Sequence, residues 1–347
     1  MGQEGILILG SNHLAALELI YSSELTKLGI RNKILGIQNI FLAHYTKSFL
    51  NKILYRLGVS KIDSKIQNII EAEVLKFKPK TVLVFKGMEI KPRTLQAIKS
   101  NGIQVVNYNP DSPFIFSGRG SGNKNVTNSI TLFDYYFTYD KTINFELQNR
   151  AVKSEIIPFG FDSSGFNYKD LEEKDEVLKL CFLGNADKVR IDFLEKLAQR
   201  GVKIDIYGEN WSAVKLHKNI CTYGPRYGLE FWRTLRKYAI QLNLLRPHNL
   251  YSHNMRSFDI LGAGGIMLAP RTPDHQTYFT EFSEVFLFSD LNEALQHIQF
   301  ILHLSFSERR MIRQAARFKA IEQHTYSHRV KQLIQYLDVQ SNCHSSF

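Results

Sequence analysis

The chain has 347 residues, of which 44% are hydrophobic and 22% are charged, which is typical of a globular protein and excludes a largely disordered chain. This length exceeds what one hydrophobic core usually supports, so two domains are expected. A net charge of +11 favours anionic partners, namely nucleotide phosphates, nucleic acid or an acidic membrane surface, without choosing among them.

The three cysteines form no CxxC pair and no cysteine–histidine cluster, so we expect no structural metal site and a reducing compartment. The start of the chain runs directly into the apolar segment Ile6–Leu9 and lacks the pattern of a signal peptide. No apolar run approaches the ~20 residues that span a bilayer. We therefore expect a cytoplasmic protein, with any membrane contact made at the inner face of the cytoplasmic membrane.

The first elements predict a βαβ unit. Residues 6–10 are expected to form a buried strand, residues 14–28 a helix and residues 34–37 a second strand. His13 lies in the polar loop between the first strand and the helix, at the carboxyl end where parallel sheets bind ligands. It is a candidate catalytic base. The loop lacks G-x-G-x-x-G, so no dinucleotide site is predicted.

Residues 42–65 interleave six basic side chains with apolar ones, opposed only by Asp63. Such a basic amphipathic segment can lie on an anionic membrane or cover an acidic acceptor, and it can equally be a solvated helix face. Two more strands are expected at 81–85 and 102–107. Asp111 follows the second of these, between two prolines, and is the leading candidate for a catalytic carboxylate; the alternative is a residue that only stabilises its own turn.

A glycine-rich segment, 117–125, is either a loop that closes over a ligand or a simple connection. The acidic segment 170–176 predicts a linker, after which the βαβ pattern restarts with a strand at 178–183. Where a strand then gives way to a helix, the chain carries Gly184, Asn185, Lys188 and Arg190, and backbone N–H groups at a helix start with nearby cations bind anions. Tyr207, in the next strand, is a further candidate on the ligand side.

The densest group of polar side chains lies at residues 251–270. A strand at 240–246 delivers Arg246, after which His253, Asn254, Arg256 and Asp259 occupy seven residues. Helical spacing places the last two on one edge, where the arginine can meet a phosphate and the aspartate can accept sugar hydroxyls, or the two can simply pair with each other. Gly264 and Gly265 are expected to end this helix before a strand at 266–268.

Six segments, in this order and over nearly all of the chain, resemble the CgeB-like bacterial glycosyltransferases of the group 1 type: Phe85–Gly87, Val106–Phe114, Pro158–Asp162, Phe182–Asn185, Asn254–Asp259 and His324–Arg329. The resemblance implies an α/β protein of the GT-B fold, with two Rossmann-like doubly wound domains facing a cleft. The expected domains are 1–165 for the acceptor and 177–320 for the nucleotide sugar, with a helix at 321–340 that returns to the first domain.

The resemblance also implies an activity and roles for the residues. The protein is expected to transfer a sugar from a nucleotide-diphosphate sugar, for which a UDP-linked donor is one candidate, to a surface glycan, a lipid-linked saccharide or a protein, in cell-envelope polysaccharide biosynthesis. By position, Asp259 corresponds to the acidic residue that holds the ribose, Arg246 and Arg256 face the diphosphate, and Gly184 and Asn185 shape the phosphate side. Beyond this substrate no cofactor is expected.

This chain departs from the family pattern at two positions, and these departures leave other activities open. Relatives usually have glutamate where this chain has Asp259, and retaining relatives often carry a second glutamate where this chain has Tyr251. No Asp-x-Asp is present, so we expect metal-independent chemistry in which cations and helix dipoles stabilise the leaving diphosphate. A sugar-nucleotide epimerase of the same fold and an inactive nucleotide-sugar-binding homologue stay open. Nucleic acid is not an expected partner, because the aromatic residues follow strand and helix patterns.

Overall fold

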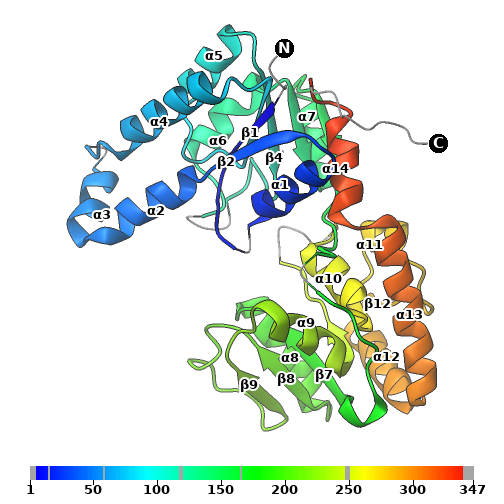
Figure 1. Cartoon of the computed structure of the whole chain (residues 1–347). Helices are drawn as coiled ribbons and strands as arrows, with labels where there is room; N and C mark the ends of the chain where they lie inside the picture. The colour runs from blue at the N-terminus through cyan, green and yellow to red at the C-terminus, as the bar shows by residue number, and fades with distance from the viewer. Residues whose placement is uncertain are drawn as a thin grey trace, which may run out of the picture. The chain divides into compact units, whose positions relative to one another are not determined.

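The computed structural model describes residues 5–14, 16–57, 59–116, 120–164, 166–246 and 251–338. The chain divides into two compact units, which are Met1–Pro158 with Arg329–Phe347, and Phe159–His328. Each unit contains one six-stranded sheet whose neighbouring strands are all parallel (Figure 1). The predicted α/β class with two doubly wound domains is thereby confirmed.

The sheet of the first unit has the order β2-β1-β3-β4-β5-β6. Its strands are β1 (Gly5–Leu9), β2 (Arg31–Leu35), β3 (Thr81–Phe85), β4 (Gln104–Asn109), β5 (Tyr135–Thr138) and β6 (Ser154–Ile156). Its helices are α1 (Leu17–Lys27), α2 (Ile37–Lys47), α3 (Phe49–Arg56), α4 (Ile62–Phe77), α5 (Pro92–Ser100), α6 (Lys124–Ser129) and α7 (Lys141–Gln148). The second half of α14 (Tyr326–Ile334) also belongs to this unit.

Both faces of this sheet are covered, which explains why its central strands are apolar without interruption. Leu7 and Leu9 join the core formed with α4 and α5, whereas Ile6 and Ile8, which alternate with them, are equally buried on the opposite face. The C-terminal segment packs on the sheet through Tyr336, whose ring lies against those of two β5 residues. The chain therefore rejoins the first unit after the break that the sequence predicts at 324–326.

The second strand was misplaced by the sequence pattern, which predicts residues 34–37. The observed strand β2 begins at the polar Arg31 and ends at Leu35, and Ile37 already starts a helix. Because β2 is at the sheet edge, its polar side chains need not enter the core. Arg31 instead lies over the Phe77 ring, and its guanidinium donates to the Phe77 carbonyl oxygen.

The sheet of the second unit has the order β12-β11-β10-β7-β8-β9. Its strands are β7 (Val177–Leu183), β8 (Ile204–Tyr207), β9 (Ile220–Tyr223), β10 (Tyr238–Leu242), β11 (Met267–Pro270) and β12 (Val285–Phe288). Its helices are α8 (Lys188–Gln199), α9 (Gly228–Lys237), α10 (Met255–Ala263), α11 (Pro273–Tyr278), α12 (Leu291–His303) and α13 (Phe306–Gln323). The exposed edge strand β9 carries no apolar pattern and was not predicted.

Two predicted loops differ in the structure. The acidic segment 170–176 lies inside the second unit. There the buried Glu176 carboxylate forms ion pairs with Arg309 and Arg313, each at 2.6 Å. Of the glycine-rich segment, residues 117–119 lie outside the described residues, and Asn123 caps the N-terminus of α6. Within the described ranges, the helices are all too short or too polar to cross a membrane.

Candidate functional site

The second unit has its topological switch point between β7 and β10, the two central strands from which the chain continues in opposite directions. Ligands of doubly wound sheets bind outside the carboxyl ends of such strands. Gly184 and Asn185 follow β7, and Arg246 lies four residues after the end of β10. The structure therefore brings three residues predicted from distant parts of the sequence to one edge of the sheet.

Arg190 holds the two loops at this edge together. Its guanidinium donates to the carbonyl oxygens of Asn185 and Leu244, each at 3.1 Å, and pairs with Asp187 at 3.2 Å. Asn185 is fixed from the other side, because its Oδ1 accepts the backbone N–H of Glu209. The sequence predicts Arg190 as one of the cations of an anion site, whereas in the structure its guanidinium is committed to two carbonyl oxygens and to Asp187.

Positive charge accumulates here. Burial lowers the pKa of Arg190, Asp187 opposes this shift, and the charges of Arg246 and Arg256 lower the pKa further. The guanidinium groups of Arg246 and Arg256 thus both lie within electrostatic range of Arg190. Arg246 is exposed, and none of the described residues forms an ion pair with it. A cationic group that is not neutralised by the protein is available to an anionic ligand.

Helix α10 begins at the same edge, with Asn254 as its N-cap. The Asn254 side chain accepts the backbone N–H of Ser257, and the Ser257 hydroxyl accepts the backbone N–H of Asn254, which forms a capping box. The backbone N–H groups of Met255 and Arg256 have no acceptor within the helix, because they belong to its first turn. A helix start of this kind stabilises a phosphate group.

Arg256 and Asp259 pair with each other on the first turns of α10, at 3.1 Å. Burial raises the pKa of Asp259 to about 7, against the opposing charge of Arg256. The Arg256 guanidinium also lies 4.3 Å from the centre of the Phe231 ring on α9. The structure thus shows the internal ion pair that the sequence offered as an alternative, and 27% of the Arg256 side chain stays exposed. Gly264 ends the helix in the left-handed conformation, at φ 80°, as predicted.

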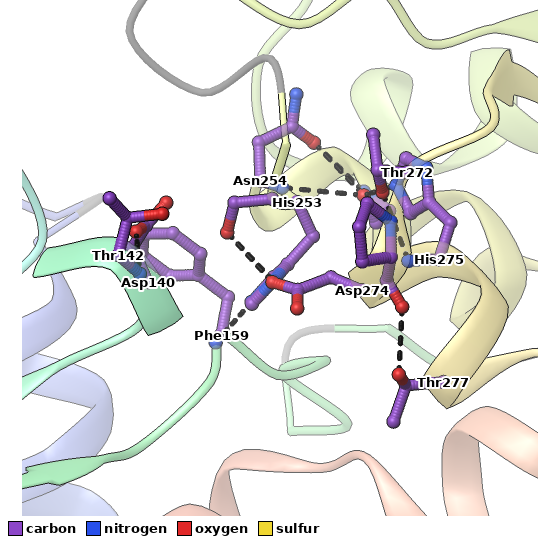
Figure 2. Close-up of polar contacts among 12 residues, drawn as sticks. Asp140, Thr142, Phe159, His253, Asn254, Thr272, Asp274, His275 and Thr277 are labelled. Atoms are coloured by element: carbon purple, nitrogen blue, oxygen red, sulfur yellow. Dashed lines mark hydrogen bonds and ion pairs between the residues drawn. The ribbon is translucent and has the colours of Figure 1, made fainter. Parts of the chain in front are cut away.

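His253 is completely buried and both of its ring nitrogens are engaged (Figure 2). The backbone N–H of Phe159 donates to Nε2 at 3.3 Å, so the ring proton resides on Nδ1 and is donated to Asp274 at 2.8 Å. The Ser252 hydroxyl donates to the same carboxylate oxygen. His253 and Asp274 therefore fix the loop before α10 and do not present a group to solvent.

A second buried chain of hydrogen bonds supports the α10 N-terminus. His275 donates through Nδ1 to the Pro270 carbonyl oxygen, so its Nε2 accepts the hydroxyl proton of Ser257 at 2.9 Å. Asn243 donates to the same hydroxyl and accepts from the Asn254 amide. Burial lowers the pKa of His275 to about 4, so this ring stays neutral near pH 7. This network was not predicted, because its members come from the end of β10, the start of α10 and the segment from Pro270 to α11, which are apart in the sequence.

The remaining predicted residues of this unit lie around the edge or behind it. Lys188 is the first residue of α8 and is exposed. Gly184 approaches the β8 loop so closely that a Cβ on Gly208 would lie 2.1 Å from its carbonyl oxygen. Gly265 packs against the Leu235 carbonyl oxygen. Tyr207 is used on the sheet face, where its hydroxyl bonds to that of Tyr238 at 2.7 Å.

The first unit has its own switch point, between β1 and β3, and a cavity of about 280 Å³ opens there. His13 lines the cavity and is exposed. The carboxylate of Asp111, the leading catalytic candidate, pairs with Lys86 at 2.5 Å, so it is not committed to its own turn, which was the alternative. Glu18 and Glu89 line the same cavity and were not predicted, although Glu89 follows a strand that the sequence located correctly.

One group of side chains has the composition of a metal site. Among the described residues, Glu281, Glu293 and His297 bring ligand atoms within 4.8 Å of one another. Arg271 occupies this position, with ion pairs of 2.5 Å to Glu281 and 2.6 Å to Glu293. A metal ion would have to displace the guanidinium, so these residues form a structural ion-pair network.

Comparison with known proteins identifies the fold. A family model described as glycosyl transferase-like matches residues 190–335, which include α10 and its N-cap. No significant match was found among curated proteins. Sucrose-phosphate synthase from Thermosynechococcus elongatus is similar in structure, with a TM-score of 0.68 at 11% identity over 96% of this chain and 98% of that one.

Two further structures are similar over nearly the whole chain. A glycosyltransferase from Rickettsia africae has a TM-score of 0.64 at 12% identity, over 97% of this chain and 98% of that one. The UDP-GlcNAc 2-epimerase of Neisseria meningitidis, bound to UDP-GlcNAc, has a TM-score of 0.56 at 13% identity, over 96% of this chain and 99% of that one. The protein has the two-domain GT-B fold, and the family match supports a glycosyltransferase-like role.

Proposed function

We propose that the protein is a glycosyltransferase, of the CgeB-like type, that moves a sugar from a nucleotide-diphosphate sugar to a hydroxyl group of a glycan, a glycolipid or a protein. The observation that carries this proposal is the group of three arginines at the switch point of the second unit, with Arg190 on α8, Arg246 after β10 and Arg256 in the first turn of α10. A nucleoside diphosphate carries negative charge that such a group binds. The position of this group inside the matched residues 190–335 supports the same conclusion.

The proposed roles follow from exposure and charge. Arg246 and the first backbone N–H groups of α10 receive the diphosphate, and Arg256 adds charge from the side. Asp259 is buried and pairs with Arg256 through Oδ2, so in this proposal its other carboxylate oxygen accepts hydroxyl groups of the ribose. As the sugar departs, negative charge grows on the diphosphate, and preorganised cations stabilise it without a metal ion. Because a neighbour of the same fold binds UDP-GlcNAc, a UDP-linked donor is the first to test.

The decisive experiment is calorimetry of UDP, UDP-glucose and UDP-GlcNAc with three variants. Arg246→Ala removes an exposed charge and is expected to weaken UDP binding about 10-fold, since a charged hydrogen bond contributes about 1.5 kcal/mol or more. Asp259→Ala is expected to weaken nucleotides that carry ribose and to leave inorganic diphosphate unaffected. Asp192→Ala, an exposed acid on α8, is the matched control and should bind like the wild type. Failure of all nucleotides to bind the wild type would reject the proposal.

Turnover separates transfer from the two alternatives. A transferase consumes the nucleotide sugar faster when a glycan acceptor is added. The similarity to a UDP-GlcNAc 2-epimerase favours epimerisation as the second candidate, for which the nucleotide sugar alone would yield an isomer. An inactive homologue would bind the nucleotide and change neither substrate.

We also propose that residues 42–65 hold the protein on the anionic inner face of the cytoplasmic membrane, near lipid-linked or envelope acceptors. Large apolar side chains stand exposed there, with Phe49 at 75%, Leu50 at 61% and Leu57 at 70%, beside exposed Lys47 and Arg56. Apolar anchors flanked by cations are typical of interfacial helices.

Cosedimentation with vesicles of anionic or neutral lipid tests this surface. The double change Phe49→Ser and Leu50→Ser should release the protein from anionic vesicles, and 0.5 M salt should weaken binding by screening. Leu75→Ser changes a residue of α4 that is 73% exposed and serves as the control. Equal binding of the double variant and the control would contradict the proposal.

A further inference from the structure

The cavity at the β1/β3 switch point of the first unit is built from three loops. Residues after β1 (Gly10, Ser11 and His13), residues after β3 (Lys86 and Glu89) and Pro110 after β4 line its walls. At about 280 Å³ it can receive one sugar ring or a similar small group. Both its position in the sheet and its polar lining are those of a ligand site.

The charge in this cavity has the opposite sign to that of the whole chain. Lys86 has its charge neutralised by Asp111, at 2.5 Å, and donates a further hydrogen bond to the Gly120 carbonyl oxygen. Glu18 and Glu89 then contribute carboxyl groups with no second cation among the described lining residues. Such a cavity accepts hydroxyl or ammonium groups, and it repels phosphate groups once its carboxyl groups are ionised, which burial shifts to higher pH for both glutamates, since it raises the pKa of each.

The two glutamates differ in what holds them. The Glu18 carboxylate accepts the backbone N–H of Ser11 at 2.6 Å and lies so close to Gly10 that a Cβ there would be 2.3 Å from it. Its role is to shape the β1 loop. Glu89 has its backbone fixed instead, since its carbonyl oxygen accepts from the buried Gln67 amide at 2.9 Å.

The Glu89 carboxylate is therefore held at the cavity by its backbone while its oxygens stay available. Within the described ranges, no other residue donates a hydrogen bond to that carboxylate. A fixed backbone with an uncommitted carboxylate in a cavity is the arrangement required of a general base.

We propose, resting on the proposed transferase function, that this cavity receives the reacting end of an acceptor that is uncharged or cationic there, and that Glu89 takes the proton from its hydroxyl group. The acceptor oxygen forms a bond to the anomeric carbon of the nucleotide sugar. The bond from that carbon to the diphosphate breaks, and the electron pair leaves with the diphosphate. The proton passes from the hydroxyl to Glu89 and then to solvent.

The surroundings of Glu89 suit this role. Burial raises its pKa to about 7, its own backbone N–H and Lys86 oppose the shift, and Glu18 and Asp63 add to it. His13, Tyr55 and the paired Asp111 are the other titratable groups around it. A carboxylate with a pKa near 7 accepts a proton more readily than an ordinary glutamate does. Transfer should therefore rise about tenfold per pH unit below pH 7 and level off above it.

Binding is tested first and without any nucleotide, by saturation-transfer NMR on the full chain. Methyl glucoside, glucosamine and glucose 6-phosphate serve as the neutral, cationic and anionic probes. The first two should give signals, which should disappear in Gln38→Trp, where a larger ring fills a partly exposed position in the cavity lining. Stronger binding of glucose 6-phosphate, or signals unchanged in Gln38→Trp, would overturn the assignment of this cavity.

Transfer is tested with Glu89→Gln and, as a matched control, Glu71→Gln, an exposed residue of α4 outside the cavity. Glu89→Gln should lower acceptor-dependent transfer about 100-fold or more and remove the inflection near pH 7, while UDP affinity and sugar binding stay within about threefold of the wild type. Transfer by Glu89→Gln within threefold of the control would overturn the role of Glu89. If the wild type does not bind UDP at all, the proposed function is rejected instead.

Discussion

Glu89→Gln should make the folded protein more stable at alkaline pH, because it removes a partly buried negative charge from the proposed site. The reason is the partial burial of the carboxyl group, which raises its pKa from 4.5 to about 7 in the folded state. The folded protein therefore holds this proton more tightly than the unfolded chain does. Stability contributed by the proton is complete below pH 4.5 and is lost as pH rises to about 7 and beyond. Glutamine keeps the shape without the charge.

The size of the effect follows from the shift. About 2.5 pKa units correspond to ~3 kcal/mol in the free energy of unfolding at pH 8.5. Because the side chain is partly exposed and solvent screens it, a gain between about 1 and 3 kcal/mol is expected for Glu89→Gln. For a domain of this size that raises the melting temperature by roughly 3–10 °C. At pH 5 the advantage should fall to about a quarter, since the wild-type residue is then protonated.

Differential scanning calorimetry of wild type, Glu89→Gln and Glu71→Gln at pH 5 and pH 8.5 measures this. The exposed Glu71 should give no pH-dependent difference. If Glu89→Gln melts no higher than the wild type at pH 8.5, or gains the same amount at both pH values, then burial does not destabilise the Glu89 carboxylate. Glu89 would then not be a base with a pKa near 7.

Three further changes test the framework around the two sites. Asp274→Asn should cost about 1–3 kcal/mol of unfolding free energy in urea titration, because a buried carboxylate that accepts from His253 and Ser252 becomes an amide; an unchanged midpoint would contradict the loop-fixing role. Gly10→Ala should cost about 1–3 kcal/mol, since the added Cβ meets the Glu18 carboxylate at 2.3 Å, and a neutral result in thermal melting would show that this loop can relax. Glu176→Gln should cost about 3 kcal/mol or more, because two buried guanidinium groups lose their counter-charge, whereas the exposed Glu172→Gln should cost little; equal losses would refute the argument.

The parallel sheets could be predicted because their signal is local. Apolar runs such as residues 81–85, each followed by a polar loop and a helix pattern, leave few alternatives to buried parallel strands. The same regularity located Gly184 and Arg246 at strand ends, so the candidate edge was predictable from order alone. Gly264 could be predicted as a helix end because only glycine takes the left-handed conformation readily.

The partners of these residues could not be predicted, because long-range packing decides them. Asp111 lies between two prolines in the sequence, yet its carboxylate forms an ion pair with Lys86, which follows a different strand. His253 has the residue type of a base, and only the fold shows that Phe159 and Asp274 occupy its two nitrogens. Glu89 carried no motif, and its importance depends on burial. Sequence order thus located the loops, while the chemistry of individual side chains required the structure.

The two switch points show why one architecture can serve two substrates. In the second unit, Asp259 neutralises Arg256 but Arg246 and the start of α10 keep positive charge at the edge. In the first unit, Asp111 neutralises Lys86, and the charge that remains is that of carboxyl groups. A diphosphate is stabilised by the first arrangement and repelled by the second, whereas a hydroxyl group loses its proton only in the second. Under the proposed function, the sign of the charge left unpaired at each sheet edge assigns the leaving group to the second unit and the attacking group to the first, a division that nucleotide and sugar binding can test separately.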